Sequence, residues 1–208
     1  NVPHVTQFDD ADITDLEAFR KSLKAEAERK GTKMTPMPFI LKACAVALNA
    51  HPKLKASLAD GSETLVYKHY CHIGMAVDTP AGLMVPVIRD VDQKSIWEIG
   101  TEVLELAAAA KDKKLRPDQM QGGVFTVSSL GGIGGRGFTP IVNAPEVAIL
   151  GVSRADVKPV WDGKSFVPRT LLPLSLSYDH RVINGGDAGR FILEMKRLLQ
   201  NPMLLLLA

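Results

Sequence analysis

The chain has few cysteines, few aromatic residues and no long apolar run. Its 208 residues include 2 cysteines, and aromatic residues make up 6% of the chain. Cys44 and Cys71 both stand in apolar surroundings, which is typical of reduced thiols rather than of a disulfide framework. No apolar segment approaches the roughly 20 residues of a membrane-spanning helix, and no signal peptide is visible. The sequence therefore favours a cytoplasmic globular protein with no membrane partner.

Neither sign of charge dominates the sequence. The formal net charge is +2 at pH 7, and no run of lysine and arginine follows the pattern of a nucleic-acid-binding segment. We therefore expect no nucleic-acid partner, whereas a small anionic ligand would suit the mild excess of positive charge. A hydrophobic content of 46% is enough for one substantial core, and no repeat or linker divides the chain. The chain starts with Asn, not Met, so we expect upstream domains outside the given sequence.

Several chemical motifs are absent or incomplete. The nucleophile-elbow pattern of hydrolases fails at Gly151-Val152-Ser153-Arg154, which lacks the closing glycine. Gly132 to Gly137 match the dinucleotide-binding pattern, but Pro140 and Pro145 follow where that motif needs a helix. We therefore expect a surface loop there and not a dinucleotide-binding site. His69, Cys71 and His72 lie close in sequence without a second pair of ligands, so we expect no metal site.

Helical and strand-like segments are mixed without strict alternation. Thr14 with Glu17, and Ser95 with Glu98, each have the spacing of a helix-capping box. Helices are predicted over 14–31, 35–51 and from 96, and a last one over the stripe from Phe191 to Leu199. The predicted strands are 2–13, 64–68, 71–78, 83–88, 123–130 and 146–152, a hairpin around 162–163, and a strand that runs to His180. This order indicates an α+β fold rather than a doubly wound sheet.

The segment that ends at His180 carries the clearest functional signal. On a strand, Leu174, Leu176, Tyr178 and His180 share one face, which predicts an imidazole at the end of an apolar row. Asp179 would point to the opposite face and is a poor candidate for orienting that ring. Taken alone, a histidine at the end of a strand is better explained as a hydrogen-bonded structural residue.

Two serines end another apolar strand, before the glycine-rich loop. Ser128 and Ser129 alternate along that strand, so only one of them can face a given cleft. A single serine in such a place is more often a turn residue. Ser128 and His180 are therefore candidate functional residues because they occur together in one chain.

That combination resembles a known family. His180-x-x-x-Asn184-Gly185 within Ser-Tyr-Asp-His-Arg-Val-Ile-Asn-Gly is similar to the signature of the dihydrolipoyl acyltransferases, the core components of 2-oxo acid dehydrogenase complexes. It is more distantly similar to chloramphenicol acetyltransferase. The likeness continues through 82–89, 125–131 and 138–151, and Ser-Ser-Leu-Gly at 128–131 is typical of acetyl-transferring members. Many relatives carry Asp in place of Asn184, so a mechanism that requires a carboxylate there is ruled out.

The resemblance implies a fold and an assembly. We expect an open mixed sheet with flanking helices, in an obligate trimer whose active sites lie between subunits. Residues 1–208 would form the catalytic domain, with lipoyl and subunit-binding domains upstream. The tail Gln200 to Leu207 ends in four leucines, which one helix stripe cannot bury together. We expect the tail to join trimers, into a cube of 24 subunits in the acetyl-transferring case.

The resemblance also implies roles for particular residues. His180 would act as the general base on a thiol, and Ser128 of a neighbouring chain would donate to the oxyanion. Asn184 would hold the surroundings of the imidazole by hydrogen bonds, with Arg20 as its expected partner. The residues expected to bind coenzyme A are Phe138, Thr139 and Asn143.

The substrates implied are coenzyme A and a lipoyl group carried on a separate domain, with no metal. The partners implied are lipoyl domains and the dehydrogenase and dihydrolipoyl dehydrogenase components of a bacterial pyruvate dehydrogenase complex. Three alternatives stay open at this stage. One is transfer of succinyl or branched-chain acyl groups in a sister complex, another is a non-catalytic scaffold, and the third is a freestanding acetyltransferase of the chloramphenicol type.

Overall fold

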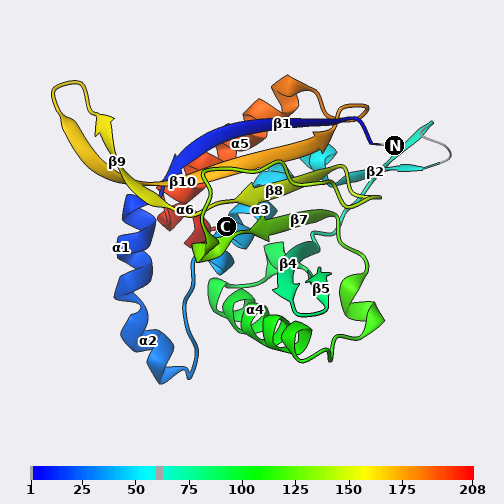
Figure 1. Ribbon diagram of the computed structural model, residues 1–208, viewed down its shortest axis with the longest axis horizontal. Coiled ribbons are helices and arrows are strands. Elements are labelled where there is room, and N and C mark those ends of the chain that lie inside the picture. Colours follow the sequence, from blue (N-terminus) through cyan, green and yellow to red (C-terminus); the bar gives the residue numbers. More distant parts are fainter. Residues whose placement is uncertain (1, 60–62) are drawn as a thin grey trace.

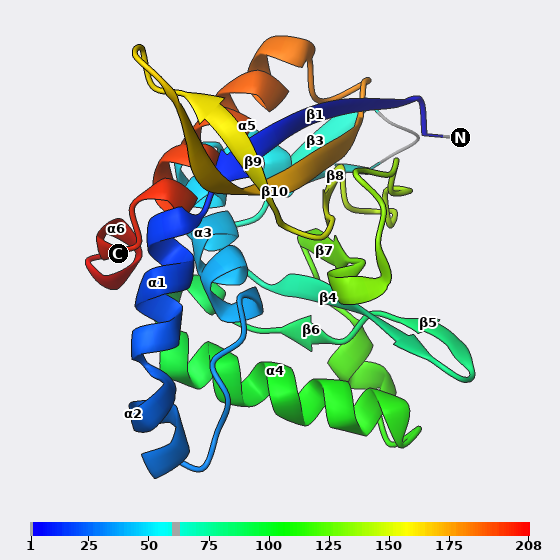
Figure 2. The same ribbon diagram turned by 60° about the vertical axis from the view of Figure 1, so that its left-hand side comes forward.

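A mixed sheet of eight strands organises the chain (Figures 1 and 2). The computed structural model describes residues 2–59 and 63–208; residues 1 and 60–62 of the predicted domain lie outside the described part. The strand order is β1-β10-β8-β7-β4-β5, with β6 paired to β4 and β9 paired to β10. The strands of this sheet are β1 His4–Asp12, β4 Ile73–Thr79, β5 Gly82–Met84, β6 Val87–Ile88, β7 Phe125–Ser129, β8 Ala148–Val152, β9 Asp156–Trp161 and β10 Phe166–Asp179.

The sheet is mixed because β7 runs parallel to both β4 and β8, while β10 runs antiparallel to β8. The helices are α1 Thr14–Ser22, α2 Lys24–Arg29, α3 Met37–Ala50, α4 Ile96–Lys111, α5 Gly185–Gln200 and α6 Met203–Leu206. Within the described residues, no helix combines the length and the apolar character needed to cross a bilayer. The predicted α+β class, an open mixed sheet with flanking helices, is confirmed.

Helix α3 forms the centre of the helical layer and contacts both α4 and α5. It is almost entirely buried from Pro38 to Leu48, as expected for a helix that is apolar all round. The apolar side of the sheet packs against this layer, and Leu174, Leu176 and Tyr178 of β10 are all within the core. The opposite side of the sheet carries small and polar residues together with Ile149 and Phe8.

That opposite side is covered by chain rather than by helix. The segment between β7 and β8 crosses it (Figure 1), and its Gly137 lies against Phe8 of β1 and Ser175 of β10. Ser175 and Ser177, which alternate with the leucines of β10, are therefore also buried. This layer matters for function because it lies over the same face of β7 that carries Ser128.

Most predicted elements are present with shifted ends, and three local expectations change. The predicted strand 83–88 is divided into β5 and β6, because Pro86 lacks a backbone donor. A separate two-stranded sheet of β2 Ala56–Ala59 and β3 Thr64–Tyr67 includes a strand that the sequence did not indicate. The first predicted helix is broken at Leu23 into α1 and α2.

The capping box predicted for the first helix is wrong. Ile13 is the cap residue and makes no side-chain capping bond. The Thr14 hydroxyl donates to Asp12 and Glu17 is engaged by Arg20, so neither side chain is available to the helix end. The second predicted capping box is confirmed: Ser95 Oγ accepts from Glu98 N at 3.3 Å, and Ser95 N donates to Glu98 Oε2 at 2.8 Å.

We expect Ser95→Ala to lower the free energy of unfolding by about 1 kcal/mol, the usual effect of removing a helix cap. Urea denaturation of the variant and the unchanged chain measures this difference. Thr101→Ala on the exposed side of α4 is the matched control, because its hydroxyl only bonds back to Trp97 O. We expect that control to stay within about 0.5 kcal/mol; equal losses in both variants would contradict a capping role.

Candidate active site

His180 follows directly after the last residue of β10. Its backbone N donates to Pro3 O at 2.9 Å, and its ring centroid lies 6.0 Å from that of Tyr178. The apolar row that leads to it is buried as predicted, but His180 itself is exposed in the single chain. The reason is that the strand ends at Asp179, so that the turn carries His180 out of the sheet. A dry environment for this imidazole must therefore come from outside the chain.

Asp179 is engaged elsewhere, as its predicted orientation implies. Arg181 Nη2 contacts Asp179 Oδ2 at 2.6 Å. Burial alone would raise the pKa of Asp179, but hydrogen bonds from Arg181 outweigh burial and hold the pKa below its usual value. The carboxylate is thus an ion-pair partner rather than the group that orients the imidazole.

Asn184 is the N-terminal cap of α5. Its Oδ1 accepts from Asp187 N at 2.9 Å, and Asp187 is fixed in turn by Lys53 at 2.9 Å. The cap of α5 thereby fixes Asn184, which follows His180 by four residues. The expected contact with Arg20 is wrong within the chain, because the Arg20 guanidinium binds Glu17 and the Met34 carbonyl.

Ser128 lies near the end of β7, on the side of the sheet covered by the crossing segment. It is in register with Gly151 of β8, which is in register with Ser175 of β10. Residues opposite one another in a sheet point to the same face, so these three form one row. A methyl group on Gly151 would lie 2.8 Å from Phe138 Cζ. The Phe138 ring therefore rests on Gly151, next to the Ser128 position.

Ser129 faces the other way, as its place in the strand predicts. Its Oγ accepts from Gly131 N at 3.1 Å. It lines a cavity of about 520 Å³ together with residues of the helical layer such as Glu17, Met37 and Ile40. The two adjacent serines thus face opposite sides of the sheet, and only Ser128 lies on the side that Phe138 covers.

The single chain does not bring Ser128 and His180 together. Ser128 is level with Ser175 across β8, whereas His180 lies beyond the far end of β10. At about 3.3 Å of rise per residue, the step from Ser175 to His180 alone spans roughly 15 Å. Two intervening strand spacings add to that separation. A reaction that needs both groups requires a second copy of the chain.

The three residues predicted to bind coenzyme A lie on the segment that crosses the sheet. Phe138 is half-buried, and Thr139 and Asn143 are exposed. The second half of the segment is held to β1, because Val142 N donates to His4 Nε2 at 2.9 Å, and Glu146 N donates within the segment to Asn143 O at 3.0 Å. The segment thus places the Phe138 ring beside the Ser128 row, whereas Asn143 follows the contact with His4, which is paired with Asp179 at the end of β10.

Glu146, at the end of this segment, was not identified as a candidate functional residue from the sequence. Only 6% of it is exposed, and its Oε2 accepts from Thr126 Oγ1 at 2.6 Å. Burial raises the pKa of Glu146 to about 7, and the Thr126 hydrogen bond only partly offsets this. The signal in the sequence was a lone acidic residue at the head of the apolar run 147–152.

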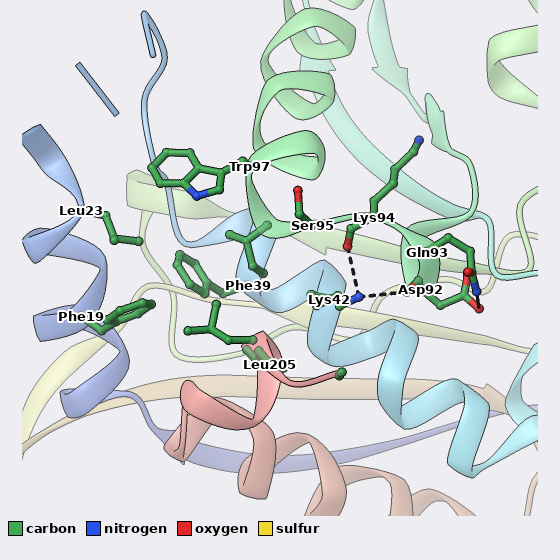
Figure 3. Close-up of a pocket in the computed structure, with 13 residues that line it drawn as sticks. Phe19, Leu23, Phe39, Lys42, Asp92, Gln93, Lys94, Ser95, Trp97 and Leu205 are labelled. Carbon is green, nitrogen blue, oxygen red and sulfur yellow. Dashed lines mark hydrogen bonds between the residues drawn. The ribbon is translucent and has the colours of Figure 1, made fainter. Parts of the chain in front are cut away.

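A cavity of about 780 Å³ lies beside the C-terminal helix, with apolar residues on one side and polar residues that include Lys42 and Asp92 on the other (Figure 3). Phe19, Leu23, Phe39 and Trp97 line it, and Leu205 of α6 points into it. On either side of Leu205, Met203, Leu206 and Leu207 stay exposed. As predicted, the chain cannot bury its terminal leucines alone.

Metal ligands and thiols give no further centre. Within the described residues, no group of three or more histidine, cysteine or acidic side chains could hold a metal ion. Cys44 and Cys71 are free and buried.

The comparisons with known proteins agree with this geometry. The family model of the 2-oxoacid dehydrogenases acyltransferase (catalytic domain) matches residues 1–207. A curated relative in Pseudomonas aeruginosa, the dihydrolipoyllysine-residue acetyltransferase component of pyruvate dehydrogenase complex, is 61% identical over 100% of this chain and 38% of its own length. The corresponding protein of Azotobacter vinelandii is also 61% identical, over 32% of its length. The chain thus spans about a third of these relatives.

Solved structures are similar over the whole fold. One of Azotobacter vinelandii dihydrolipoamide acetyltransferase has 60% identity and a TM-score of 0.97, and the match covers 99% of this chain and 85% of that one. That study addressed the role of a serine, a histidine and an asparagine in the catalytic mechanism. The cubic core of the pyruvate dehydrogenase multienzyme complex matches with the same values.

Chloramphenicol acetyltransferase, 13% identical, has a TM-score of 0.62 over 95% of this chain and 89% of that one, and shows a common fold only. The family model, in contrast, matches residues 1–207, and the two curated relatives are 61% identical to this chain. The chain belongs to the family of 2-oxoacid dehydrogenase acyltransferases and contains its catalytic domain.

Proposed function

We propose that this chain transfers an acetyl group between coenzyme A and the dihydrolipoyl group of a lipoyl domain, as the core of a pyruvate dehydrogenase complex. One observation carries the proposal. The serine, histidine and asparagine studied in the Azotobacter vinelandii enzyme stand at the same spacing as Ser128, His180 and Asn184 here. The two chains are 60% identical with a TM-score of 0.97, which supports equivalent places for all three.

The reaction needs a base for the attacking thiol. A thiol with a pKa near 8.5 is mostly protonated at neutral pH, and the neutral imidazole of His180 accepts its proton as sulfur attacks the acetyl carbonyl. The bond from the carbonyl carbon to the leaving sulfur then breaks. His180 returns the proton to that thiolate, so the enzyme ends each transfer unchanged.

The tetrahedral intermediate needs a donor for its oxyanion. Ser128 supplies a hydroxyl on a strand, which holds the donor rigidly in place. Since His180 of the same chain lies far from it, we assign the Ser128 hydroxyl and the His180 imidazole of each site to neighbouring chains. Asn184, fixed by α5, supports the surroundings of His180 without adding charge. This arrangement requires a second chain at each site, and we infer the trimer with three shared sites that the family resemblance implies.

The remaining parts of the function go beyond the catalytic domain. We infer that residues 1–208 act beside lipoyl and subunit-binding domains of a longer chain, because the curated relatives are about three times as long. The partners would be the lipoyl domains and the dehydrogenase and dihydrolipoyl dehydrogenase components. Bacterial relatives and buried free thiols support a place in the cytoplasm.

An acyl-donor panel tests the proposed function against its alternatives. Transfer to free dihydrolipoamide is measured from acetyl-, succinyl- and isobutyryl-coenzyme A. We expect the highest kcat/KM with acetyl-coenzyme A. A preference for either other donor would assign the chain to a sister complex, and no transfer from any donor would indicate a non-catalytic scaffold.

Substitutions at the two proposed catalytic groups give the next prediction. His180→Ala should lower kcat by roughly 10²–10⁴-fold, the range for a lost general base, with little change in KM. Ser128→Ala should lower kcat by about 10²–10³-fold, as other oxyanion donors do. Ser129→Ala is the matched control and should keep most activity, since Ser129 faces the helical layer.

Mixed assemblies test the shared site directly. If each site joins His180 of one chain with Ser128 of the next, co-expressed His180→Ala and Ser128→Ala chains form some sites with both groups intact. We expect these mixed trimers to recover a measurable fraction of activity that neither variant has alone. Mixed assemblies as inactive as the separate variants would contradict a site shared between chains.

We propose that the C-terminal tail joins trimers into a cube of 24 chains. The exposed leucines of α6 match the apolar lining of the cavity beside it (Figure 3), and a pair of chains can exchange such contacts symmetrically. Each leucine side chain buried in this way contributes on the order of 1.5–3 kcal/mol. The cubic core that is 60% identical to this chain supports the proposal.

Deleting residues 203–208 should therefore release soluble trimers from the larger particle, with activity on free dihydrolipoamide largely kept. Light scattering and sedimentation measure the particle size. Leu193→Ser, which removes another exposed leucine on α5, is the control and should leave the large particle intact. A large particle that survives the deletion shows that the tail is not the contact between trimers. Monomers would show that it belongs to the interface within them.

A further inference from the structure

A buried polar pair lies beneath the segment that crosses the sheet. Thr126 is 1% exposed and Glu146 is 6% exposed, and they are joined by the 2.6 Å hydrogen bond described above. Thr126 stands two residues before Ser128 on β7, so both hydroxyls face the same side. The crossing segment is thus attached to the strand that carries the proposed oxyanion donor.

The surroundings of this pair are shaped to hold it. A methyl group on Gly123 would lie 2.8 Å from Glu146 Oε1, and one on Gly74 would lie 3.0 Å from Thr126 Oγ1. Neither glycine has a positive φ, so both are explained by space and not by backbone conformation. Any side chain at either place would push the carboxyl or the hydroxyl away.

A purely structural role would be better filled by apolar side chains. Among the described residues, no cation pairs with Glu146, and burial is what raises its pKa. The side chains of Arg89 and His72 lie against Gly122, the neighbour of Gly123. A buried carboxyl without a cation is costly, so this one calls for a functional explanation.

The connections of Glu146 point to that explanation. Its backbone N donates to Asn143 O, and the next residue, Val147, accepts from Asp179 N at 2.8 Å. Glu146 therefore lies where the crossing segment meets the Ser128 strand and the end of β10, and its side chain supplies the bond to the Ser128 strand. We propose that Glu146, held by Thr126, is a positioning residue that fixes Phe138, Thr139 and Asn143 in place for coenzyme A. This inference rests on the proposed function.

Steady-state kinetics with varied acetyl-coenzyme A test the proposal on the complete assembled protein. We expect Glu146→Ala and Thr126→Val to raise KM for acetyl-coenzyme A about tenfold while kcat changes less than about threefold, because only binding is disturbed. Thr126→Ser keeps the hydroxyl and should restore the original KM. Light scattering verifies that each variant keeps its assembly.

Ser177→Ala is the matched control for a lost buried hydroxyl. Ser177 bonds to Thr6 at 2.7 Å and lies in the same row of the sheet as Thr126, with Ile149 between them. It has no bond to the crossing segment. We therefore expect its KM for acetyl-coenzyme A to stay unchanged even where its stability falls.

Glu146→Gln keeps the shape of the side chain and removes its ionisation. Burial raises the folded-state pKa from 4.5 to about 7, so the stabilising contribution of the neutral carboxyl is complete below about pH 4.5 and lost as pH rises through about 7. Relative to Glu146→Gln, we expect Tm of the unchanged chain to fall between about pH 4.5 and 7, and its KM for acetyl-coenzyme A to rise between about pH 6 and 8 as the folded-state carboxyl ionises.

Two results overturn the inference in distinguishable ways. An active unchanged chain whose Glu146→Ala and Thr126→Val variants keep KM, or lose kcat alone, refutes the positioning role and leaves the proposed function standing. An unchanged chain that transfers no acetyl group refutes the proposed function, and this inference with it.

Discussion

The pairing of β8 with β7 on one side and β10 on the other determines where the chemistry of this chain can occur. It places Ser128, Gly151 and Ser175 in one row and sends β10 onward to a turn at His180. No side-chain rotation closes a gap of several residues along a strand. Ser128 and His180, the two groups proposed to act in catalysis, are therefore held apart by the backbone hydrogen bonds of the sheet. Bringing such groups together requires a second chain with the same rigid sheet.

The uneven covering of the sheet also follows from this pairing. One side carries the leucines of β10 and is sealed by α3 and its neighbours. The other carries serines, glycines and Thr126, and is covered by a segment of loop. A loop needs polar anchors where a helix needs an apolar stripe. The buried Glu146 carboxyl and the His4 ring supply such anchors, and the same segment presents side chains next to Ser128.

The alternation of Leu174 to Tyr178 and the apolar stretch before Ser128 were sufficient to predict both strands and the opposite faces of Ser128 and Ser129. The sequence predicted a water-poor place for His180 at the end of the apolar row, but the strand ends one residue earlier and His180 is exposed in the single chain. Arg20 was assigned by its place in the first helix, whereas Glu17 and Met34 engage it in the structure. Glu146 has no periodic pattern, and only the space left by Gly123 and Gly74 makes its place understandable.

The exposed groups at the two ends of the molecule call for different contacts. His180 follows the end of β10, beside the start of β1, while α6 and the C-terminus lie at the opposite edge of the molecule (Figure 2). An imidazole that works as a base on a thiol gains from a site without water, and exposed leucines gain from apolar burial. One interface cannot satisfy both, since they are separated by the width of the fold. The proposed function therefore assigns this chain two kinds of self-contact, one that completes the active site and one that builds a larger particle.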